Sequence, residues 1–515
     1  MASIVSYMPV LRETWATKFG MILATAGAAI GLGNLLRFPV QASQHGGGAF
    51  MIPYFLFLTI MGIPMMWLEW TIGRLGGRYG HGTTPGIFEI LWPHPIAKYL
   101  GVLGLIIPLI LGIYYLYVCS WTLAFAFFSL TKAYFGLNDL ESMSNFLRSF
   151  QGIEKGPFSS IWTAYLFFLI TFFANFIILY RGLGKGIERL SRLAMPTLFF
   201  IAIVLMIRAL TLGTPDPSYP DRNALAGLGF LWNPNFSQLK DASTWLAAAG
   251  QIFFTLSLGL GTIQCYASYL REKDDIVLSG LTVTSLNEIA EVIFGGSIAI
   301  PAAVAFFGIA QISKGGAFDL AFLSTPLVLT HLPLGQIWGF LWFSLLFFAG
   351  LTSSVSIIQP CVAFLIDELN IPWKRAVVMI AIFSFLPTQM VIFFLKHGFL
   401  DELDFWIGTM SLPILGTIEV ILFGWVYGID KGFSEMHKGA WIKVPNIYRF
   451  VLKYITPTCL IVIFFVWLLQ DGIDVLLLRG IPACDRPYRL LARGLILFSL
   501  LLAGWLIHLA WRKRK

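Results

Sequence analysis

Charged residues are scarce in this chain of 515 residues, of which 12% are charged and 57% are apolar. A soluble domain carries about 25% charged residues, so a soluble protein of this length could not cover its surface with so few. The sequence also lacks a polar or low-complexity linker that would divide it into several soluble domains. These deficits predict an all-α polytopic membrane protein, because each membrane-crossing helix needs only about 20 apolar residues.

Signatures of several other protein classes are missing too. The glycines at 46–48 are not followed by the Lys-Ser/Thr of a phosphate-binding loop, so no ATP-driven pump is indicated. The sequence contains no HExxH motif and no nucleophile elbow, and neither an arginine ladder nor a TVGYG-type filter. The five cysteines show no CxxC or Cys/His spacing, which argues against zinc or a disulfide framework. We therefore do not expect an enzyme.

The net charge of +8 does not indicate a nucleic-acid partner, because the basic residues lie in short clusters between apolar runs. The first 16 residues lack the layout of a signal peptide. The expected partner at this point is the lipid bilayer. The short tails favour the inner (plasma) membrane of a prokaryotic cell, and a homodimer is left open as the assembly.

Twelve apolar segments are predicted to be transmembrane helices. They are residues 17–43, 49–73, 99–130, 161–180, 190–210, 245–270, 277–307, 336–365, 376–396, 403–428, 450–470 and 490–511. With both termini in the cytoplasm, most Lys and Arg residues fall on the cytoplasmic side, as the positive-inside rule requires. The last outer loop, with Arg479, Arg486, Arg489 and Arg493, is an exception. We interpret residues 312–334 as an outer re-entrant hairpin.

Two spans are interrupted by paired glycines, at Gly31-Leu32-Gly33-Asn34 in the first and at Gly259-Leu260-Gly261-Thr262 in the sixth. Each glycine weakens a helix by about 1 kcal/mol relative to alanine, and unwound backbone at membrane depth is tolerated only beside protein or a wet cavity. Close helix packing is the alternative explanation. Matched breaks five spans apart favour two inverted five-helix repeats around a transporter's central site. The predicted units are residues 1–16 (cytoplasmic segment), 17–210 and 245–428 (repeats), and 450–511 (helices 11 and 12).

Neutral side-chain oxygens gather beside the breaks and in the run 349–354. They belong to Asn34, Thr255, Ser257, Asn287, Thr352 and Ser353. Singly, such residues usually serve helix packing. Together they favour a site for a hard cation such as sodium, which needs several oxygen ligands.

Charged residues inside the spans are expected to have partners or functions, because a central arginine costs about 2.5–3.5 kcal/mol on insertion scales. Arg37 should face a wet cavity, with Asp404 as its candidate partner; snorkelling to the interface is the alternative. Glu291 lies one helical turn from Asn287, which favours a role in ion or proton coupling. Three further carboxylates are interpreted as structural, namely Glu69, Glu288 and Glu419.

The chain resembles the neurotransmitter:sodium symporter family, especially its bacterial amino-acid transporters. The most specific stretches are WATKFG, GLGNLLRFP, HGGGAFMIPY, IYYLY, FFTLSLGLG, LNEIAEV, FFAGLTSS and DELDFW. The resemblance runs from Trp15 to the region 441–457 and, more weakly, to the end of the chain. It implies discontinuous helices 1 and 6 and two sodium ions as the coupling ions.

The resemblance also implies ligands for sodium and substrate. The first sodium would be held by the Ala29 carbonyl, Asn34, Thr255, Asn287 and the substrate carboxylate. The second would be held by the carbonyls of Gly27, Ile30 and Ala349 and the hydroxyls of Thr352 and Ser353. The substrate would contact Ala29, Leu32, Gly33, Leu111, Tyr115, Phe254, Thr255, Ser257, Leu260, Ser353 and Ile357. The outer gate would be Arg37 with Asp404 above Tyr115 and Phe254; the inner gate would be Arg12, Trp15, Tyr269 and Asp367.

Two positions refine the expected substrate. Relatives that carry monoamines have an aspartate where this chain has Gly31, so Gly31 favours a substrate with its own carboxylate. Chloride-dependent relatives have a neutral residue at Glu291; a carboxylate there, near Tyr54 and Gln251, would replace chloride, with proton counter-movement left open. The sequence therefore predicts a chloride-independent, sodium-coupled symporter of a neutral, hydrophobic amino acid that works by alternating access. An amino-acid-binding membrane sensor and an ion channel on the same fold are the alternatives.

Overall fold

The computed structural model describes residues 13–313 and 320–514, and its membrane spans are helical apart from the breaks in the first and sixth. Ten helices are long and apolar enough to cross a membrane, and a pair bent by 47°, Lys18–Ala29 with Gly33–Gln44, can form an eleventh span. The sixth predicted span consists of two shorter helices with six non-helical residues between them. The predicted all-helical polytopic fold is therefore confirmed.

The first five spans contain helices separated by short π-helical turns. The described elements are α1 (Lys18–Ala29), a π-helical turn (Gly33–Arg37), α2 (Phe38–Gln44), α3 (Gly48–Phe57), a π-helical turn (Leu58–Gly62), α4 (Ile63–Arg78), α5 (Thr84–Leu91), α6 (Ala97–Leu100), α7 (Leu103–Thr131), α8 (Leu140–Phe150), α9 (Trp162–Tyr180), a π-helical turn (Leu183–Glu188) and α10 (Arg189–Leu210).

The remaining spans follow a connecting helix, α11 (Ala224–Trp232), and a 3-10 turn (Phe236–Lys240). From the sixth to the eighth span, connecting helices included, the elements are α12 (Ala242–Thr255), α13 (Thr262–Ala267), α14 (Ile276–Glu288), a π-helical turn (Ile289–Gly295), α15 (Gly296–Phe307), α16 (Ile309–Ile312), a π-helical turn (Leu320–Ser324), α17 (Thr325–Thr330) and α18 (Gly335–Asp367). Spans nine to twelve contain α19 (Trp373–Phe393), a 3-10 turn (Leu395–His397), α20 (Phe399–Leu403), α21 (Leu412–Ile421), α22 (Ile429–Met436), α23 (Ile447–Phe450), α24 (Thr456–Trp467), α25 (Ile473–Leu476) and α26 (Arg486–Arg514), with π-helical turns at Asp404–Ser411, Leu422–Gly428, Val451–Ile455 and Leu468–Gly472.

Spans one and six run in opposite directions through the bundle. At one end, Gly47, which follows span one, pairs with Pro234, which precedes span six. At the other end, the Trp15 indole before α1 donates to the Tyr266 carbonyl in α13 at 3.1 Å. The two helix breaks therefore meet midway between these contacts, as inverted repeats require.

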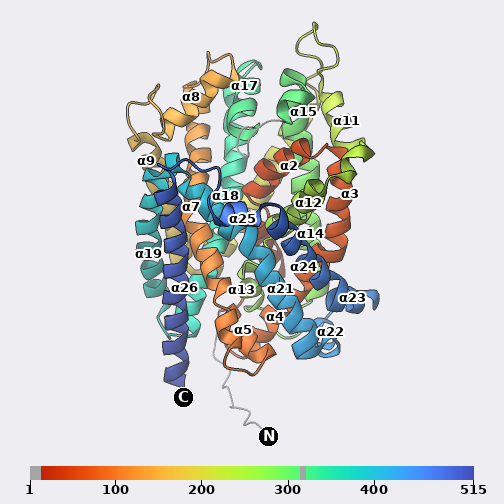
Figure 1. Cartoon of the computed structure of the whole chain (residues 1–515), viewed down its shortest axis with the longest axis vertical. Coiled ribbons are helices and arrows are strands. Elements are labelled where there is room, and N and C mark those ends of the chain that lie inside the picture. Colours follow the sequence, from red (N-terminus) through yellow and green to blue (C-terminus); the bar gives the residue numbers. More distant parts are fainter. Residues whose placement is uncertain (1–12, 314–319, 515) are drawn as a thin grey trace.

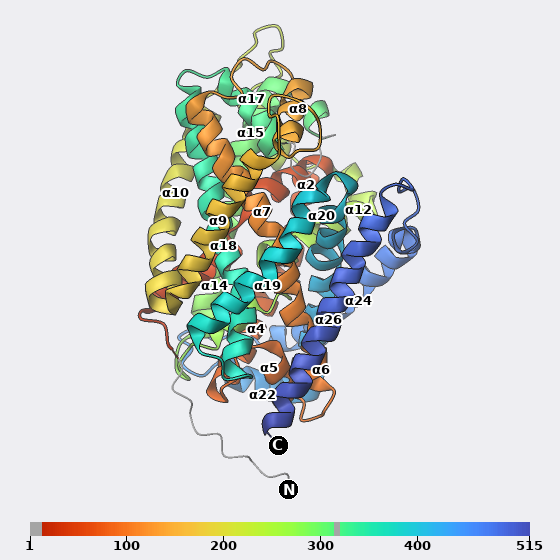
Figure 2. The ribbon, with the colours of Figure 1, turned by 90° about the vertical axis from the view of Figure 1, so that its left-hand side faces the viewer.

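The spans form a buried centre and a lipid-facing periphery. In the most apolar stretch of α7, 83% of residues are buried, against 22% in α26. Figures 1 and 2 show α26 and α19 on the outside of the bundle and α7 and α18 within it. A polytopic protein can expose many large apolar side chains in this way because lipid, not water, covers them.

The connecting helices mark the two ends of the molecule. Figure 1 shows α8, α11 and α17 at one end and α5 and α22 at the other, where α26 also ends. The apolar helix over 320–330 is too short to cross a membrane, which agrees with the interpretation of 312–334 as something other than a span. Residues 314–319 of that predicted hairpin lie outside the described residues.

The outer-loop arginines that break the positive-inside pattern have an acidic partner in the fold. Arg493 Nε lies 2.6 Å from Glu402 Oε1, and Arg489 Nη1 lies 3.2 Å from Glu402 Oε2. The Trp406 indole donates to the same carboxylate at 2.7 Å. These contacts tie the start of α26 to α20 and give two arginines of the predicted last outer loop a counter-charge.

We predict that Glu402→Gln lowers the free energy of unfolding by about 1–2 kcal/mol, because Glu402 is 3% exposed and its arginines would lose their counter-charge. Thermal unfolding in detergent micelles would measure the change. Asp474→Asn is the matched control: its ion pair with Arg479 is mostly exposed, at 60% and 63%, so its effect should be near zero. Equal shifts for the two variants would contradict this account.

Candidate functional site

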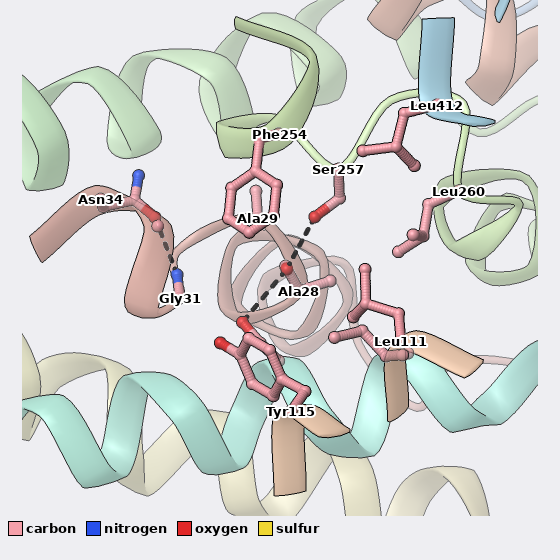
Figure 3. Close-up of a pocket in the computed structure, with 13 residues that line it drawn as sticks. Ala28, Ala29, Gly31, Asn34, Leu111, Tyr115, Phe254, Ser257, Leu260 and Leu412 are labelled. Atoms are coloured by element: carbon pink, nitrogen blue, oxygen red, sulfur yellow. Dashed lines mark hydrogen bonds between the residues drawn. The ribbon is translucent and has the colours of Figure 1, made fainter. Parts of the chain in front are cut away.

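A cavity of about 30 Å³ lies between the two helix breaks. The lining residues come from spans one, three, six, eight and ten; they are Ala28, Ala29, Gly31, Gly33, Asn34, Leu111, Tyr115, Phe254, Ser257, Leu260, Ser353, Ile357 and Leu412. Figure 3 shows the side chains of Phe254, Tyr115, Leu111 and Leu260 around it.

The break in span one leaves backbone groups that are satisfied by side chains rather than by a helix. The Gly31 amide donates to Asn34 Oδ1 at 2.8 Å, and the Leu32 amide donates to the Tyr115 hydroxyl at 3.0 Å. The Ser257 hydroxyl, from the opposite break, donates to the Ala28 carbonyl at 3.1 Å (Figure 3). Both breaks therefore present polar backbone to one shared space.

The break in span six depends on two glycines in the left-handed region. Gly259 has φ +65°, and an added Cβ would lie 2.1 Å from the Leu412 carbonyl oxygen. Gly261 has φ +81°, and its Cβ would lie 2.7 Å from the Gly104 carbonyl oxygen. Only glycine fits these places without strain or collision, so the sequence pattern fixes the position of the break.

Gly31 is closely packed beside the cavity. An added Cβ would lie 2.6 Å from Ser353 Oγ and 2.8 Å from the Tyr115 hydroxyl oxygen. Any side chain at this position, a carboxylate included, would therefore displace both hydroxyls.

The side chains of the predicted first sodium site lie together. Asn34 Nδ2 is 2.8 Å from Thr255 Oγ1 and 2.8 Å from Asn287 Oδ1. All three side chains are buried. A 180° turn of the Asn34 side-chain amide would place Oδ1 where Nδ2 now faces Thr255 and Asn287, because the oxygen and the NH₂ group occupy nearly the same space. This turn would bring a third side-chain oxygen to the predicted site. Ala29, the remaining predicted protein ligand, lines the adjoining cavity.

Glu291 belongs to the same cluster rather than to a separate site. Its Oε2 lies 3.1 Å from Asn34 Nδ2 and accepts a hydrogen bond from Thr255. Gln251 donates to Oε1 at 2.7 Å, as expected from the sequence. The expected neighbour Tyr54 donates to Glu288 at 2.8 Å and also interacts with Glu291.

The five residues of the predicted second sodium site also meet, between α1 and α18. Ser353 Oγ lies 3.1 Å from the Gly27 carbonyl oxygen and 3.2 Å from that of Ile30. Thr352 Oγ1 lies 3.1 Å from the Ala349 carbonyl oxygen, and its Cβ would be 3.1 Å from a Cβ added to Gly27. Neutral hydroxyl and carbonyl oxygens of this kind suit a hard monovalent cation.

The predicted outer ion pair is not formed in this conformation. The Arg37 guanidinium lies over the Phe254 ring, 4.6 Å from its centre, and Arg37 Nη1 is buried without a hydrogen-bond partner among the described residues. Asp404 accepts instead from the Tyr114 hydroxyl at 2.7 Å. The aromatic ring satisfies the cation, so a gate made by these two residues stays a prediction.

The predicted inner gate is partly assembled. Trp15 packs edge-on against Tyr269, with 6.3 Å between the ring centres. Asp367 accepts a hydrogen bond from the Gly82 amide at 3.0 Å. Arg12, the fourth residue of the predicted inner gate, lies outside the described residues.

Two of the carboxylates interpreted as structural support the break in span six. Glu69 Oε1 accepts the Gly259 amide at 2.7 Å, and Glu419 accepts a hydrogen bond from Gln264. These bonds satisfy the unwound segment and the first turn of α13. They agree with a supporting role for both residues.

Two residues near the cavity were not singled out from the sequence. Leu412 begins α21 and lines the cavity, but an apolar residue in an apolar span carries no signal in a sequence. Tyr114 had a signal in the IYYLY stretch, which also contains Tyr115. Its bond to Asp404 could not be inferred, because the partner is far away in the sequence.

A cavity at the meeting point of two broken, oppositely directed spans is the architecture of a secondary transporter. The model of the sodium:neurotransmitter symporter family matches residues 12–137 and 139–473. An uncharacterised sodium-dependent transporter of Methanocaldococcus jannaschii is 32% identical over 477 residues, covering 89% of this chain and 91% of the relative.

More distant matches extend the comparison. A sodium-dependent serotonin transporter of Drosophila melanogaster is 26% identical, covering 90% of this chain and 77% of the relative. The crystal structure of MhsT in complex with L-phenylalanine matches with a TM-score of 0.76 and 29% identity, covering 88% of this chain and 99% of that one.

The chain therefore belongs to the sodium:neurotransmitter symporter family, which confirms the resemblance seen in the sequence. It is a multi-pass, sodium-dependent membrane transporter and not an enzyme.

We predict that Gly31→Ala raises the sodium concentration needed for half-maximal thermal stabilisation about tenfold, or ~1.4 kcal/mol. The added Cβ would push Ser353 Oγ away from the carbonyls of Gly27 and Ile30. Unfolding temperatures recorded across a sodium titration would measure this. Gly250→Ala is the matched control, because a Cβ at Gly250 would meet no atom within 4 Å. An unchanged sodium titration for Gly31→Ala would contradict the prediction.

Proposed function

We propose that this protein is a symporter that couples the entry of sodium to the uptake of a neutral, hydrophobic amino acid by alternating access. The observation that carries the proposal is the cavity between the two breaks, where free backbone groups and neutral side chains converge. No charged side chain lines it. A zwitterion suits such a site because each of its charges can meet peptide dipoles of the opposite sign.

The substrate carboxylate would lie beside the start of the second half of span one. The amides of Leu32 and Gly33 and the Tyr115 hydroxyl surround this point, and a helix start favours an anion. The carboxylate would also contact the sodium in the first site, so that ion and substrate strengthen each other's binding reciprocally.

The substrate ammonium would face the ends of α1 and α12, where carbonyl groups lack helical partners. Ala29 ends α1 and Thr255 ends α12. The Phe254 carbonyl and the Ser257 hydroxyl complete this proposed contact. Helix C-termini favour a cation for the same electrostatic reason that helix N-termini favour an anion.

The substrate side chain would extend into the apolar part of the cavity, between Leu111, Leu260, Ile357 and Leu412. The related MhsT was crystallised with L-phenylalanine, which supports an apolar amino acid here. Discrimination among apolar side chains is weak in principle, because one methylene contributes only about 1–3 kcal/mol.

Two sodium ions are proposed as co-substrates. The first would use the Ala29 carbonyl, Asn34, Thr255 and Asn287, and the second the Gly27, Ile30, Ala349, Thr352 and Ser353 oxygens. One ion moving inward gains about 2.3 kcal/mol per 100 mV, which could sustain roughly fifty-fold accumulation of substrate before the sodium gradient is counted.

Glu291 is proposed to make transport independent of chloride. It is fully buried and contacts Asn34, Gln251 and Thr255. A negative charge at this distance would balance the first sodium without a bound anion. Proton counter-movement through Glu291 is left open by the same geometry.

Alternating access would use the two layers of residues above and below the cavity. Arg37 and Asp404, with Tyr115 and Phe254, would close the outer path; Trp15, Tyr269 and Asp367, with Arg12, would close the inner one. Residues 17–210 and 245–428 would form the two repeats, followed by helices 11 and 12 at 450–511. The segment 1–16 and both termini are proposed to face the cytoplasm of a prokaryotic cell, and a homodimer is left open.

The decisive experiment is uptake of radiolabelled L-phenylalanine and L-leucine into sealed proteoliposomes with and without an inward sodium gradient. We expect saturable accumulation only with sodium. Binding without accumulation would favour a sensor, and large ionic currents without saturable uptake would favour a channel. Uptake that is unaffected by sodium removal would overturn the proposal.

We predict that Glu291→Ser makes uptake depend on chloride, because the variant loses the fixed charge but keeps a hydroxyl. Uptake by this variant should fall at least tenfold when gluconate replaces chloride, whereas the unmodified protein should be unaffected. Glu154→Ser is the control, since Glu154 is exposed in an outer loop. If Glu291→Ser transports equally in both salts, the charge-balance account is wrong.

Thr255→Ala and Asn34→Ala should each raise the sodium concentration for half-maximal uptake about tenfold, because each removes one oxygen of the first site. Sodium titration of initial uptake rates would measure the effect. Thr282→Ala is the control, since Thr282 bonds only its own helix backbone in the described structure. Intact sodium dependence in both test variants would mean that the first site is misplaced.

A further inference from the structure

A single buried carboxylate holds the beginning of the first span. Glu188 ends the π-helical turn that opens span five, and it is 1% exposed. Its Oε2 accepts the Ala16 amide at 3.0 Å, and its Oε1 accepts the Thr17 hydroxyl at 3.0 Å. One carboxylate therefore binds two consecutive residues at the start of α1.

The helix start is shaped around this carboxylate. Thr17 is the N-cap of α1, and its hydroxyl oxygen also accepts the Gly20 amide at 2.9 Å. Arg192, one turn after Glu188, donates to Glu188 Oε1 at 2.5 Å and to Thr17 Oγ1 at 2.6 Å. A Cβ on Gly20 would lie 1.9 Å from Glu188 Oε1. Glycine at this position is therefore required for the contact.

The segment that Glu188 holds lies between the central cavity and one end of the molecule. The C-terminal end of α1, at Ala29, adjoins the break in span one. Before its N-terminal end, the Trp15 indole donates a hydrogen bond to the Tyr266 carbonyl of α13. A second cavity of about 130 Å³ lies beside this start, lined in part by Thr17, Met21 and Leu270. Movement of the start of α1 away from α13 would enlarge that cavity toward the central one.

We propose that Glu188 is a latch: a positioning residue that holds the first half of span one against span five and so keeps the inner pathway closed. The inference rests on the proposed alternating-access function and adds a residue to the inner gate that the sequence pattern did not identify. Glu188 touches neither the central cavity nor the two predicted sodium sites among the described residues.

The latch needs a carboxylate and not merely a side chain of the same size. Both oxygens of Glu188 face donors: an amide on one side, and a hydroxyl and a guanidinium on the other. In Glu188→Gln one of these donors would meet the amide NH₂ group, which cannot accept a hydrogen bond. The isosteric variant should therefore open the latch while preserving packing.

The experiment follows the alkylation rate of a cysteine reporter, Leu270→Cys, in protein whose Cys459 and Cys484 are replaced by serine. Leu270 is 7% exposed and lines the cavity beside α1. We expect Glu188→Gln to raise the alkylation rate of this reporter about tenfold in sodium-containing buffer, because hydrogen bonds to a charged acceptor are lost. Sodium should also bind more weakly, since an open inner pathway releases it.

Two further variants keep the test independent of one substitution. Gly20→Ala should raise the alkylation rate similarly, because its Cβ displaces the Glu188 carboxylate. Asp430→Asn is the matched control, because this aspartate is 81% exposed and pairs only with Arg449 among the described residues; its rate should equal that of the parent.

Equal alkylation rates in the parent, Glu188→Gln and Gly20→Ala would overturn the latch. A second reporter on the outer side is Met410→Cys, at a residue that is 8% exposed. If Glu188→Gln raised the alkylation rate of this reporter as much as that of Leu270→Cys, the whole protein would have loosened, and the latch would also be overturned. The proposed function has a separate readout: absence of sodium-driven uptake in the unmodified protein would refute symport, while the alkylation rates would still decide whether Glu188 holds α1.

Discussion

The structure depends on one constraint: polar backbone groups in the middle of a bilayer must find partners within the protein. Continuous helices meet this constraint automatically, but the first and sixth spans do not. Their breaks are satisfied by side chains from other spans, with Tyr115 accepting the Leu32 amide and Glu69 accepting the Gly259 amide. The same unwound segments leave carbonyls and helix ends directed at a shared cavity. The instability of the breaks and the polar lining of the cavity therefore have the same origin.

The chemistry of the central region is mostly neutral. Amide, hydroxyl and carbonyl oxygens approach one another around Asn34 and around Ser353, and a single carboxylate, Glu291, adds fixed charge. Such oxygens can bind a weakly held cation and release it again, which a transporter requires and a tight metal site would prevent. Glycine contributes close packing rather than chemistry, because a Cβ at 31, 259 or 261 would collide with neighbouring groups.

Ionic contacts toward the two ends of the bundle tie the starts of helices to neighbouring spans. Glu402 binds two arginines of α26 beside span ten. Glu188 binds the start of α1 beside span five. Partial burial strengthens these contacts relative to surface ion pairs.

The sequence alone determined the spans, the two breaks and most of the cavity, because apolar length and glycine pairs are local properties with direct physical consequences. The family motifs also identified the oxygens that meet at both predicted sodium sites. Only the tertiary structure decided which charged and polar groups pair: Arg37 lies over Phe254, Asp404 bonds Tyr114, and Tyr54 bonds Glu288. It also added Leu412 to the cavity and Glu188 to the start of α1. These contacts join residues far apart in the chain, and their geometry depends on helix rotation and π-helical turns that no local pattern specifies.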